Sequence, residues 1–140
     1  KAAPVIRDIS VLSQKLYEEI KTSENFTAHY EKKGLLMLCQ TEKLLEEELK
    51  MVELAVELGL EAKGIGLKEI KELEPKVEIN AVGGAYFKCD HHATPHEFMT
   101  EMKSHLKKVD VTLYTNEKVE DIKVTNQNIT ALKTTRQTLK

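Results

Sequence analysis

One short stretch of the sequence concentrates the residue types that could do chemistry, VGGAYFKCDHHATPHEFMTEM, from Val82 to Met102. Its reactive residues are Cys89, Asp90, His91, His92 and His96. Thiolate and imidazole groups bind zinc, and a thiol beside a histidine can serve as a nucleophile. Adjacent histidines rarely share one tetrahedral ion, however, and the sequence has no second ligand pair with zinc spacing. Neighbours in sequence are not thereby paired in space, so we predict neither a metal site nor a thiol enzyme.

The same stretch is typical of the joint between a strand and a helix. The apolar run from Ala81 to Lys88 predicts a strand, and its paired glycines indicate a bend or a close approach of two backbones. Thr94 is the expected N-cap of the next helix, a proline follows at the first helical position, and Glu97 completes a capping box. Asp90 to Ala93 is then the turn, and we expect its histidines to line a loop at the helix N-terminus.

Three other segments have helical patterns. Apolar residues recur every three or four positions from Pro4 to about Ser23. Glu42 to Leu58 repeats this pattern between Thr41, an N-cap residue, and Gly59, which can adopt the left-handed conformation that ends a helix. Leu67 to Leu73 is a shorter helix that stops before a proline.

Short β-strands account for most of the remaining chain. Tyr30 and the run Leu35 to Cys39 flank a Lys-Lys-Gly turn, which predicts a hairpin, and Leu60 to Gly66 is expected to be an extended connector. Further strands are predicted at Asp110 to Tyr114, Val119 to Val124 and Ile129 to Thr134, the last two joined by an Asn-Gln-Asn turn. The sequence therefore predicts one α+β domain over residues 1–140, with a mainly antiparallel sheet covered by helices.

Composition argues against several classes of protein. The 140 residues carry a net charge of -2 without a basic stripe, so nucleic acid is not an expected partner. No apolar run approaches the roughly 20 residues needed to cross a bilayer. Two cysteines are too few for a disulfide framework and suit a reducing cytoplasm. Gly64-Ile65-Gly66 lacks the third glycine of a dinucleotide-binding fingerprint, so we interpret it as a turn.

Three segments resemble FAD-dependent amine oxidoreductases, the group of D-amino acid oxidase and dehydrogenase, glycine oxidase and sarcosine oxidase. They are KKGLLMLCQTEKLLEEELKMVELAVELGLEAKGIGLKEIKELEPKV, GGAYFKCDHHATPHEFM and VTLYTNEKVEDI. The order of features carries the resemblance: Gly-Leu-Leu, a Glu-rich helix, Glu-Leu-Glu-Pro, Gly-Gly before a strand, Asp-x-x-x-x-Pro opening a helix, and Asn-x-x-Val. It covers about Pro4 to Lys140 and looks closest to the bacterial D-amino acid dehydrogenase branch.

The resemblance implies roles for a few residues. Val119 lies in the segment whose valine backbone meets the FAD adenine, which makes it the expected cofactor contact; an ordinary core valine is the alternative. Asp90 and Pro95 match the family's Asp-x-x-x-x-Pro turn, where relatives often have Asp at the position of Thr94. We interpret this turn mainly as structural, and we take Asp90 and His92 as candidate substrate-binding residues.

The parent enzyme implied by the resemblance oxidises a D-amino acid or similar small amine to an imino acid. FAD does the electron chemistry, while the protein aligns the reacting carbon and binds the substrate carboxylate. Arginine is the natural carboxylate clamp, but neither Arg7 nor Arg136 is assigned this role. The alternatives are an FAD-dependent 2-hydroxy acid dehydrogenase of the same fold and a non-enzymatic α+β interaction module.

The resemblance further implies that this chain is the first half of a substrate domain. Residues 110–140 would begin the return toward an FAD-binding domain whose fingerprint lies upstream. Because no initiator methionine precedes Lys1, we also expect a piece of a longer protein. We therefore predict that the isolated chain is inactive, does not hold FAD tightly and self-associates through an exposed apolar face. A cytoplasmic location is expected, with association of the parent with the inner face of the membrane left open.

Overall fold

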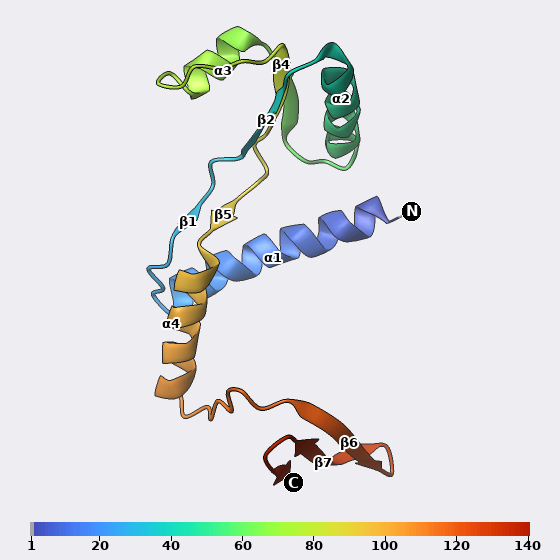
Figure 1. Cartoon of the computed structure of the whole chain (residues 1–140), viewed down its shortest axis with the longest axis vertical. Coiled ribbons are helices and arrows are strands. Elements are labelled where there is room, and N and C mark those ends of the chain that lie inside the picture. Colours follow the sequence, from blue (N-terminus) through green and yellow to red (C-terminus); the bar gives the residue numbers. More distant parts are fainter. Residues whose placement is uncertain (1) are drawn as a thin grey trace. The chain divides into compact units, whose positions relative to one another are not determined.

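The computed structural model describes residues 2–140 and divides the chain into two compact units, the first ending at Met102 and the second spanning Lys103–Lys140. Figure 1 labels their helices and strands. Four helices and three antiparallel sheets confirm the predicted α+β class among the described residues. That residues 1–140 form one domain stays a prediction.

Helix α1 (Ala3–Ser23) has the predicted proline in its first turn, and none of its residues is buried. Polar contacts hold one of its faces to the rest of the first unit. Gln14 Nε2 donates to the carbonyl oxygen of Cys89 at 2.8 Å, and Lys21 Nζ donates to that of Ala28 at 2.7 Å. The other face therefore leaves its apolar residues exposed.

The hairpin predicted around Lys-Lys-Gly is wrong. The strands concerned are β1 (Tyr30–Glu31), β2 (Leu35–Cys39), β4 (Gly83–Phe87) and β5 (His92–Ala93). β1 and β2 follow one another along a ribbon, and they pair antiparallel with β5 and β4 respectively (Figure 1). Gly34, with a φ of 74°, instead directs its N–H to the carbonyl oxygen of Asp90 at 3.0 Å. This glycine makes an irregularity within the ribbon, not the tip of a hairpin.

β4 is the central strand of a three-stranded antiparallel sheet of order β2-β4-β3. β3 (Ala62–Ile65) lies in the segment predicted to be a mere connector, so that prediction is corrected. Gly84 pairs with Leu38 on one side and Ile65 on the other, and a Cβ here would collide with the carbonyl oxygen of Met37. The predicted close approach of two backbones at the glycine pair is thus confirmed.

Helices α2 (Glu42–Glu57) and α3 (Leu67–Leu73) cover opposite faces of this sheet. Leu45 of α2 lies against Gly83, whereas Ile70 of α3 lies against Gly84, whose missing side chain would point to the other face. Ile70 has an exposed fraction of 0% and is the largest fully buried side chain among the described residues.

Both predicted ends of α2 are confirmed. Thr41 Oγ1 accepts the backbone N–H of Leu44 at 3.3 Å, so it satisfies one of the unpaired donors of the first turn. Gly59 follows the helix with a φ of 77°, the left-handed conformation expected of it.

Helix α4 (Pro95–Lys108) begins at the predicted proline, but the predicted capping box is wrong. The N–H of Thr94 donates to the carbonyl oxygen of His29 at 3.0 Å, and the Glu97 carboxylate accepts the N–H of His29 at 2.9 Å. Thr94 and Glu97 therefore bind the segment before β1 instead of each other. The start of α4 is fixed by a tertiary contact.

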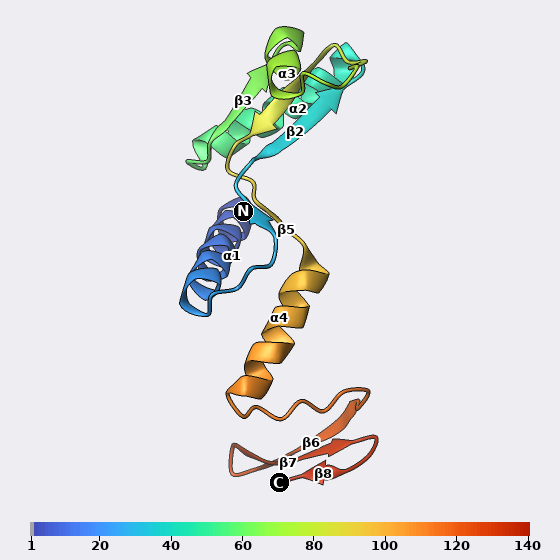
Figure 2. The same ribbon diagram turned by 90° about the vertical axis from the view of Figure 1, so that its left-hand side faces the viewer.

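The second unit contains the sheet β6-β7-β8, shown in Figure 2. Its strands are β6 (Val119–Thr125), β7 (Asn128–Thr134) and β8 (Thr138–Leu139). Asn126 and Gln127 both have positive φ, as a two-residue hairpin turn requires, so this predicted turn is confirmed. The strand predicted at Asp110 to Tyr114 is wrong, because Asp110 is left-handed and Val111 donates its N–H back to Leu106 at 2.9 Å, which ends α4.

The chain exposes an unusually large surface. Its accessible area is 10790 Å². Two separate globules with the lengths of the two units would expose about 8,700 Å². Of the described residues, only eight apolar ones are buried, and many large apolar side chains remain exposed. None of the described helices is both long and apolar enough to span a membrane.

Candidate functional site

The two residues proposed for substrate binding have different surroundings. Asp90 is half-buried and lines a groove in the first unit. His92 is exposed and belongs to β5, where it pairs with Glu31 of β1. The turn predicted for Asp90 to Ala93 is therefore corrected in its second half, which is a strand. The binding roles of Asp90 and His92 stay predictions.

His91, which lies between them, makes contacts that the sequence did not reveal. Its Nδ1 is 2.7 Å from the Tyr30 hydroxyl oxygen and 3.8 Å from Glu18 Oε1. Lys32 Nζ approaches the same Glu18 oxygen at 2.6 Å. Only 16% of the His91 side chain is exposed. We call Glu18, Tyr30 and His91 the ribbon cluster, because they join α1 to the paired strands β1 and β5.

Tyr30 supplies a proton donor in the ribbon cluster. Burial, and then the nearby Glu18 and Tyr17, raise the pKa of Tyr30 above its usual value near 10, so its phenol is neutral at physiological pH. The hydroxyl forms a hydrogen bond with Nδ1 of His91, in which the donor depends on the tautomer of the imidazole. The cluster can therefore fix the orientation of an imidazole, although the Tyr30 contact occupies one of its nitrogens.

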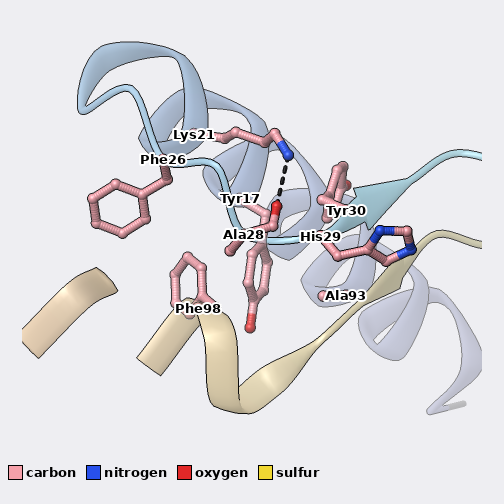
Figure 3. A pocket seen from close by; sticks show the side chains of 8 residues that line it. All are labelled: Tyr17, Lys21, Phe26, Ala28, His29, Tyr30, Ala93 and Phe98. Carbon is pink, nitrogen blue, oxygen red and sulfur yellow. Dashed lines mark hydrogen bonds between the residues drawn. The ribbon is translucent and has the colours of Figure 1, made fainter. Parts of the chain in front are cut away.

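The aromatic residues beside the ribbon cluster form a small core. Figure 3 shows Tyr17, Phe26, Tyr30 and Phe98 gathered around the segment before β1, where Lys21 reaches the carbonyl of Ala28. The rings of Tyr17 and Phe98 are 4.7 Å apart, and those of Phe26 and Phe98 are 5.8 Å apart. The cavity between them is about 10 Å³, roughly the space of one water molecule. This region is packing and offers no room for a substrate.

A much larger space lies between α1, α2 and the sheet of the first unit. This groove has a volume of about 580 Å³, within the usual range for small-molecule sites. Its walls are mostly apolar, and its polar residues include Arg7, Gln14, Glu48 and Asp90. Of the sequence-predicted site residues, only Asp90 lines it.

Arg7 is already engaged within the chain. Its Nη1 donates to the carbonyl oxygen of Leu58, at the end of α2, at 2.6 Å. Its Nε lies 2.6 Å from Asp8 Oδ1, an ion pair without hydrogen-bond geometry. Since both contacts hold the guanidinium at the groove wall, Arg7 is not a free carboxylate clamp.

The cysteines lack the character of nucleophiles. Burial, and then the charge of Asp90, raise the pKa of Cys89; burial, and then Glu48, raise that of Cys39. Both thiols therefore stay protonated near neutral pH. Among the described residues there is also no group of three histidine, cysteine or acidic side chains able to hold a metal ion.

The glycines that come nearest to a dinucleotide fingerprint do not fit a pyrophosphate. Gly64 lies in β3 with Leu49 of α2 directly over the position of its missing side chain. Gly66 is the N-cap of α3, and its N–H donates to the Glu69 carboxylate at 3.4 Å. Hydrogen bonds from Lys63 and then from the Gly66 N–H lower the pKa of Glu69, so a negative charge already occupies this helix start. These two glycines therefore do not form a pyrophosphate-binding turn.

Val119, the predicted cofactor contact, is the first residue of β6 and pairs with Thr134. Its exposed fraction is 49%, so within this chain it is not the buried core valine of the alternative interpretation. Contact with an adenine stays a prediction.

This α+β chain, with its antiparallel sheet and ribbon, matches a known family of flavoenzymes. The sequence model of the FAD dependent oxidoreductase (DAO) family matches residues 2–140, so the chain belongs to this family. None of the curated proteins matches it.

Solved structures share the fold. Glycine oxidase from Geobacillus kaustophilus superposes with a TM-score of 0.77 at 20% identity, over 98% of this chain and 37% of that one. Glycine oxidase from Bacillus cereus ATCC 14579 also gives 0.77 at 20% identity, over 95% and 37%. L-proline dehydrogenase from P. horikoshii gives 0.71 at 21% identity, over 90% and 33%. The chain thus spans about a third of the length of each structure.

Proposed function

We propose that this chain is the first part of the substrate domain of an FAD-dependent oxidoreductase that oxidises a small amino acid or amine. The observation that carries the proposal is the match of the family model to residues 2–140. The assignment to one part of an enzyme is supported by the coverage of about a third of each related structure. The excess exposed surface is consistent with further residues that cover it.

The proposed substrates are D-amino acids and similar small amines, which would be oxidised to imino acids. The related structures are named as an L-proline dehydrogenase and a glycine oxidase. These names support an amino acid as the substrate. These substrates share a hydrogen on the carbon beside nitrogen, which is the hydrogen removed in amine oxidation. Of the candidate residues, Asp90 is the better placed to face a ligand, because it lines the groove and His92 does not.

FAD, when bound, would supply the electron chemistry of the parent enzyme. The first unit would contribute walls of the substrate chamber through the β2-β4-β3 sheet, and β6 would contribute Val119 to the cofactor. The pyrophosphate would be held by residues outside this chain, since Glu69 already takes the N–H of Gly66. The isolated chain is therefore proposed to be inactive.

The test compares two proteins. The 140-residue chain is expected to purify colourless and to bind no stoichiometric FAD. A longer chain that includes an upstream Gly-x-Gly-x-x-Gly segment is expected to be yellow and to reduce its flavin with an amino acid. The substrate panel would include D-amino acids, glycine, L-proline, sarcosine and 2-hydroxy acids.

Several results would contradict the proposal. Stoichiometric flavin on the 140-residue chain would show that this chain holds FAD by itself, which contradicts the proposal that residues outside it bind the pyrophosphate. Flavin reduction by 2-hydroxy acids alone would replace the amine substrate, and stop codons on both sides of this segment in the gene would favour an interaction module.

A further inference from the structure

Two carboxylates of α4 bind the segment before β1. Glu97 and Glu101 are four positions apart, so they lie on the same face of the helix. Glu97 accepts the backbone N–H of His29 at 2.9 Å. Glu101 accepts the N–H groups of Thr27 at 3.0 Å and Ala28 at 2.9 Å, and also the Thr27 hydroxyl. We call the two glutamates and residues 27–29 the α4 clasp.

The backbone of residues 27–29 depends on these carboxylates. The segment belongs to no helix or strand, and within the described part of the chain its three N–H groups donate to no backbone carbonyl. The N–H of Thr94, which precedes α4, donates to the carbonyl oxygen of His29 at 3.0 Å. If α4 moves away, these bonds are lost together, and the segment and the helix are therefore coupled.

Little buried apolar surface holds α4 in place. None of its residues is buried. Phe98 approaches the rings of Tyr17 and Phe26, with ring centres 4.7 Å and 5.8 Å apart (Figure 3). Of the hydrogen bonds that Glu97 and Glu101 accept in the α4 clasp, all but the one from Ala28 are exposed, so water can replace the carboxylate as a partner. Elements with exposed hydrogen bonds and few buried contacts open at a low cost in free energy.

The β2-β4-β3 sheet is held in a different way. Both outer strands pair with β4 along ladders of backbone hydrogen bonds. Ala85 of β4 and Ile70 of α3 each have an exposed fraction of 0%. Opening the sheet would therefore expose fully buried apolar side chains to water, whereas opening the α4 clasp would not. The sheet should accordingly require more free energy to open than the clasp.

We propose that the α4 clasp opens as one unit by local unfolding while the β2-β4-β3 sheet stays folded. In the open state, water hydrogen-bonds to the N–H groups of residues 27–29, and Phe98 leaves the rings of Tyr17 and Phe26. Glu97 and Glu101 set the balance between closed and open states, because the bonds that they accept are charge-assisted. The proposal concerns contacts within the first unit and does not depend on the assignment of a cofactor or substrate.

Hydrogen exchange of the 140-residue chain, followed by NMR, tests the opening. The amides of residues 27–29 and of α4 report on the α4 clasp, and those of β4 report on the sheet. Glu101→Gln keeps an acceptor oxygen but removes the charge, and it is expected to accelerate exchange in the clasp by about tenfold. Exchange in β4 should change by less than about twofold. Glu72→Gln, an exposed position on α3, is the matched control and should change neither set.

Two further variants test whether the α4 clasp opens as one unit. Glu97 accepts the N–H of His29, so independent bonds would let Glu97→Gln affect the His29 amide alone. Opening as one unit requires that Glu97→Gln also accelerate exchange at Thr27 and Ala28, by about threefold or more. Phe98→Ala removes the ring contacts but no hydrogen bond of the clasp, and it should accelerate the same amides while leaving those of β4 unchanged.

An acceleration confined to the His29 amide in Glu97→Gln would overturn the proposal, because the bonds would then break independently. Equal acceleration of the clasp and β4 amides would mean that the chain opens only as a whole, which overturns it as well. So would clasp variants whose exchange matches that of Glu72→Gln.

Discussion

The hydroxyl of Tyr30 meets Nδ1 of His91 at 2.7 Å across a sequence separation of 61 residues. The antiparallel register of β1 and β5, which pairs Tyr30 with Ala93, brings the two residues together. Their rings meet edge to face, while Tyr30 also stacks on Tyr17 of α1 with ring centres 5.9 Å apart. This hydrogen bond therefore connects the two chain segments of the ribbon at the point where Tyr17 of α1 packs against Tyr30.

Tyr30→Phe is expected to lower the free energy of unfolding by about 1 kcal/mol. The phenylalanine keeps the stacking on Tyr17 but leaves Nδ1 of His91 without its hydrogen-bond partner. Urea denaturation measures the change. Tyr114→Phe is the control, because Tyr114 is 53% exposed, and its effect should stay within about 0.5 kcal/mol. Equal effects of the two substitutions would show that the Tyr30 hydrogen bond does not contribute to stability.

The Tyr30 hydroxyl should also make the stability of the protein depend on pH. The pKa of Tyr30 is raised in the folded protein, chiefly by burial, so the folded state holds this proton more tightly than the unfolded chain. As the pH rises above about 10, the unfolded chain ionises first and folding loses stability. The stability advantage of the wild type over Tyr30→Phe should therefore be constant below that pH and shrink above it. Denaturation of both proteins in a series of alkaline buffers measures this, and a constant advantage would exclude the raised pKa.

Local signals predict the elements of the fold better than they predict which elements pair. Thr41 and Gly59 fix the ends of α2 because capping depends on residues within one turn. Gly34 is misleading, since a left-handed glycine makes a hairpin tip or a ribbon irregularity according to which strand lies opposite. That strand is 53 residues further along, as the bond from Tyr86 to the carbonyl of Lys33 illustrates.

In the candidate site, too, local sequence signals do not predict which distant segments come together. Asp90 belongs to a motif that the sequence shares with a family, and it does line the groove. The sequence predicts His91 only as a loop residue, since its contacts with Glu18 and Tyr30 depend on the packing of α1 and the pairing of β1 with β5. No periodicity or spacing in one sequence encodes a cluster drawn from three distant segments. The sequence therefore predicts the family of the chain but not the ribbon cluster.

The carboxylate of Glu101, in α4, binds the loop before β1. Because this contact depends on the negative charge, we expect the protein to lose stability in acid. Its carboxylate accepts the N–H groups of Thr27 at 3.0 Å and Ala28 at 2.9 Å, and also the Thr27 hydroxyl. The Thr27 hydroxyl first, and then these backbone groups, hold its pKa below the usual value. The stabilisation is present above about pH 4.3 and is lost as the pH falls through the lower folded pKa.

Glu101→Gln should therefore be less stable than the wild type at neutral pH, with the difference disappearing at low pH. Thermal unfolding at a series of pH values measures it. Glu72→Gln, an exposed position on α3, serves as the control. A difference that persists unchanged into acid would show that the amide, and not the lost charge, is responsible.

We expect substitution by serine to have opposite effects on stability at Gly84 and at Gly66. A side chain at Gly84 would collide with the carbonyl oxygen of Met37 on the neighbouring strand, and backbone cannot move aside as a flexible side chain can. Gly84→Ser should therefore destabilise the first unit by about 2 kcal/mol or more. A Cβ at Gly66 would meet no atom within 4 Å, and this residue caps α3, where serine is a good N-cap residue. Gly66→Ser should therefore keep or slightly raise stability. Chemical denaturation of the two variants measures both effects. A tolerated serine at Gly84 would mean that β2 and β4 do not pair in this register.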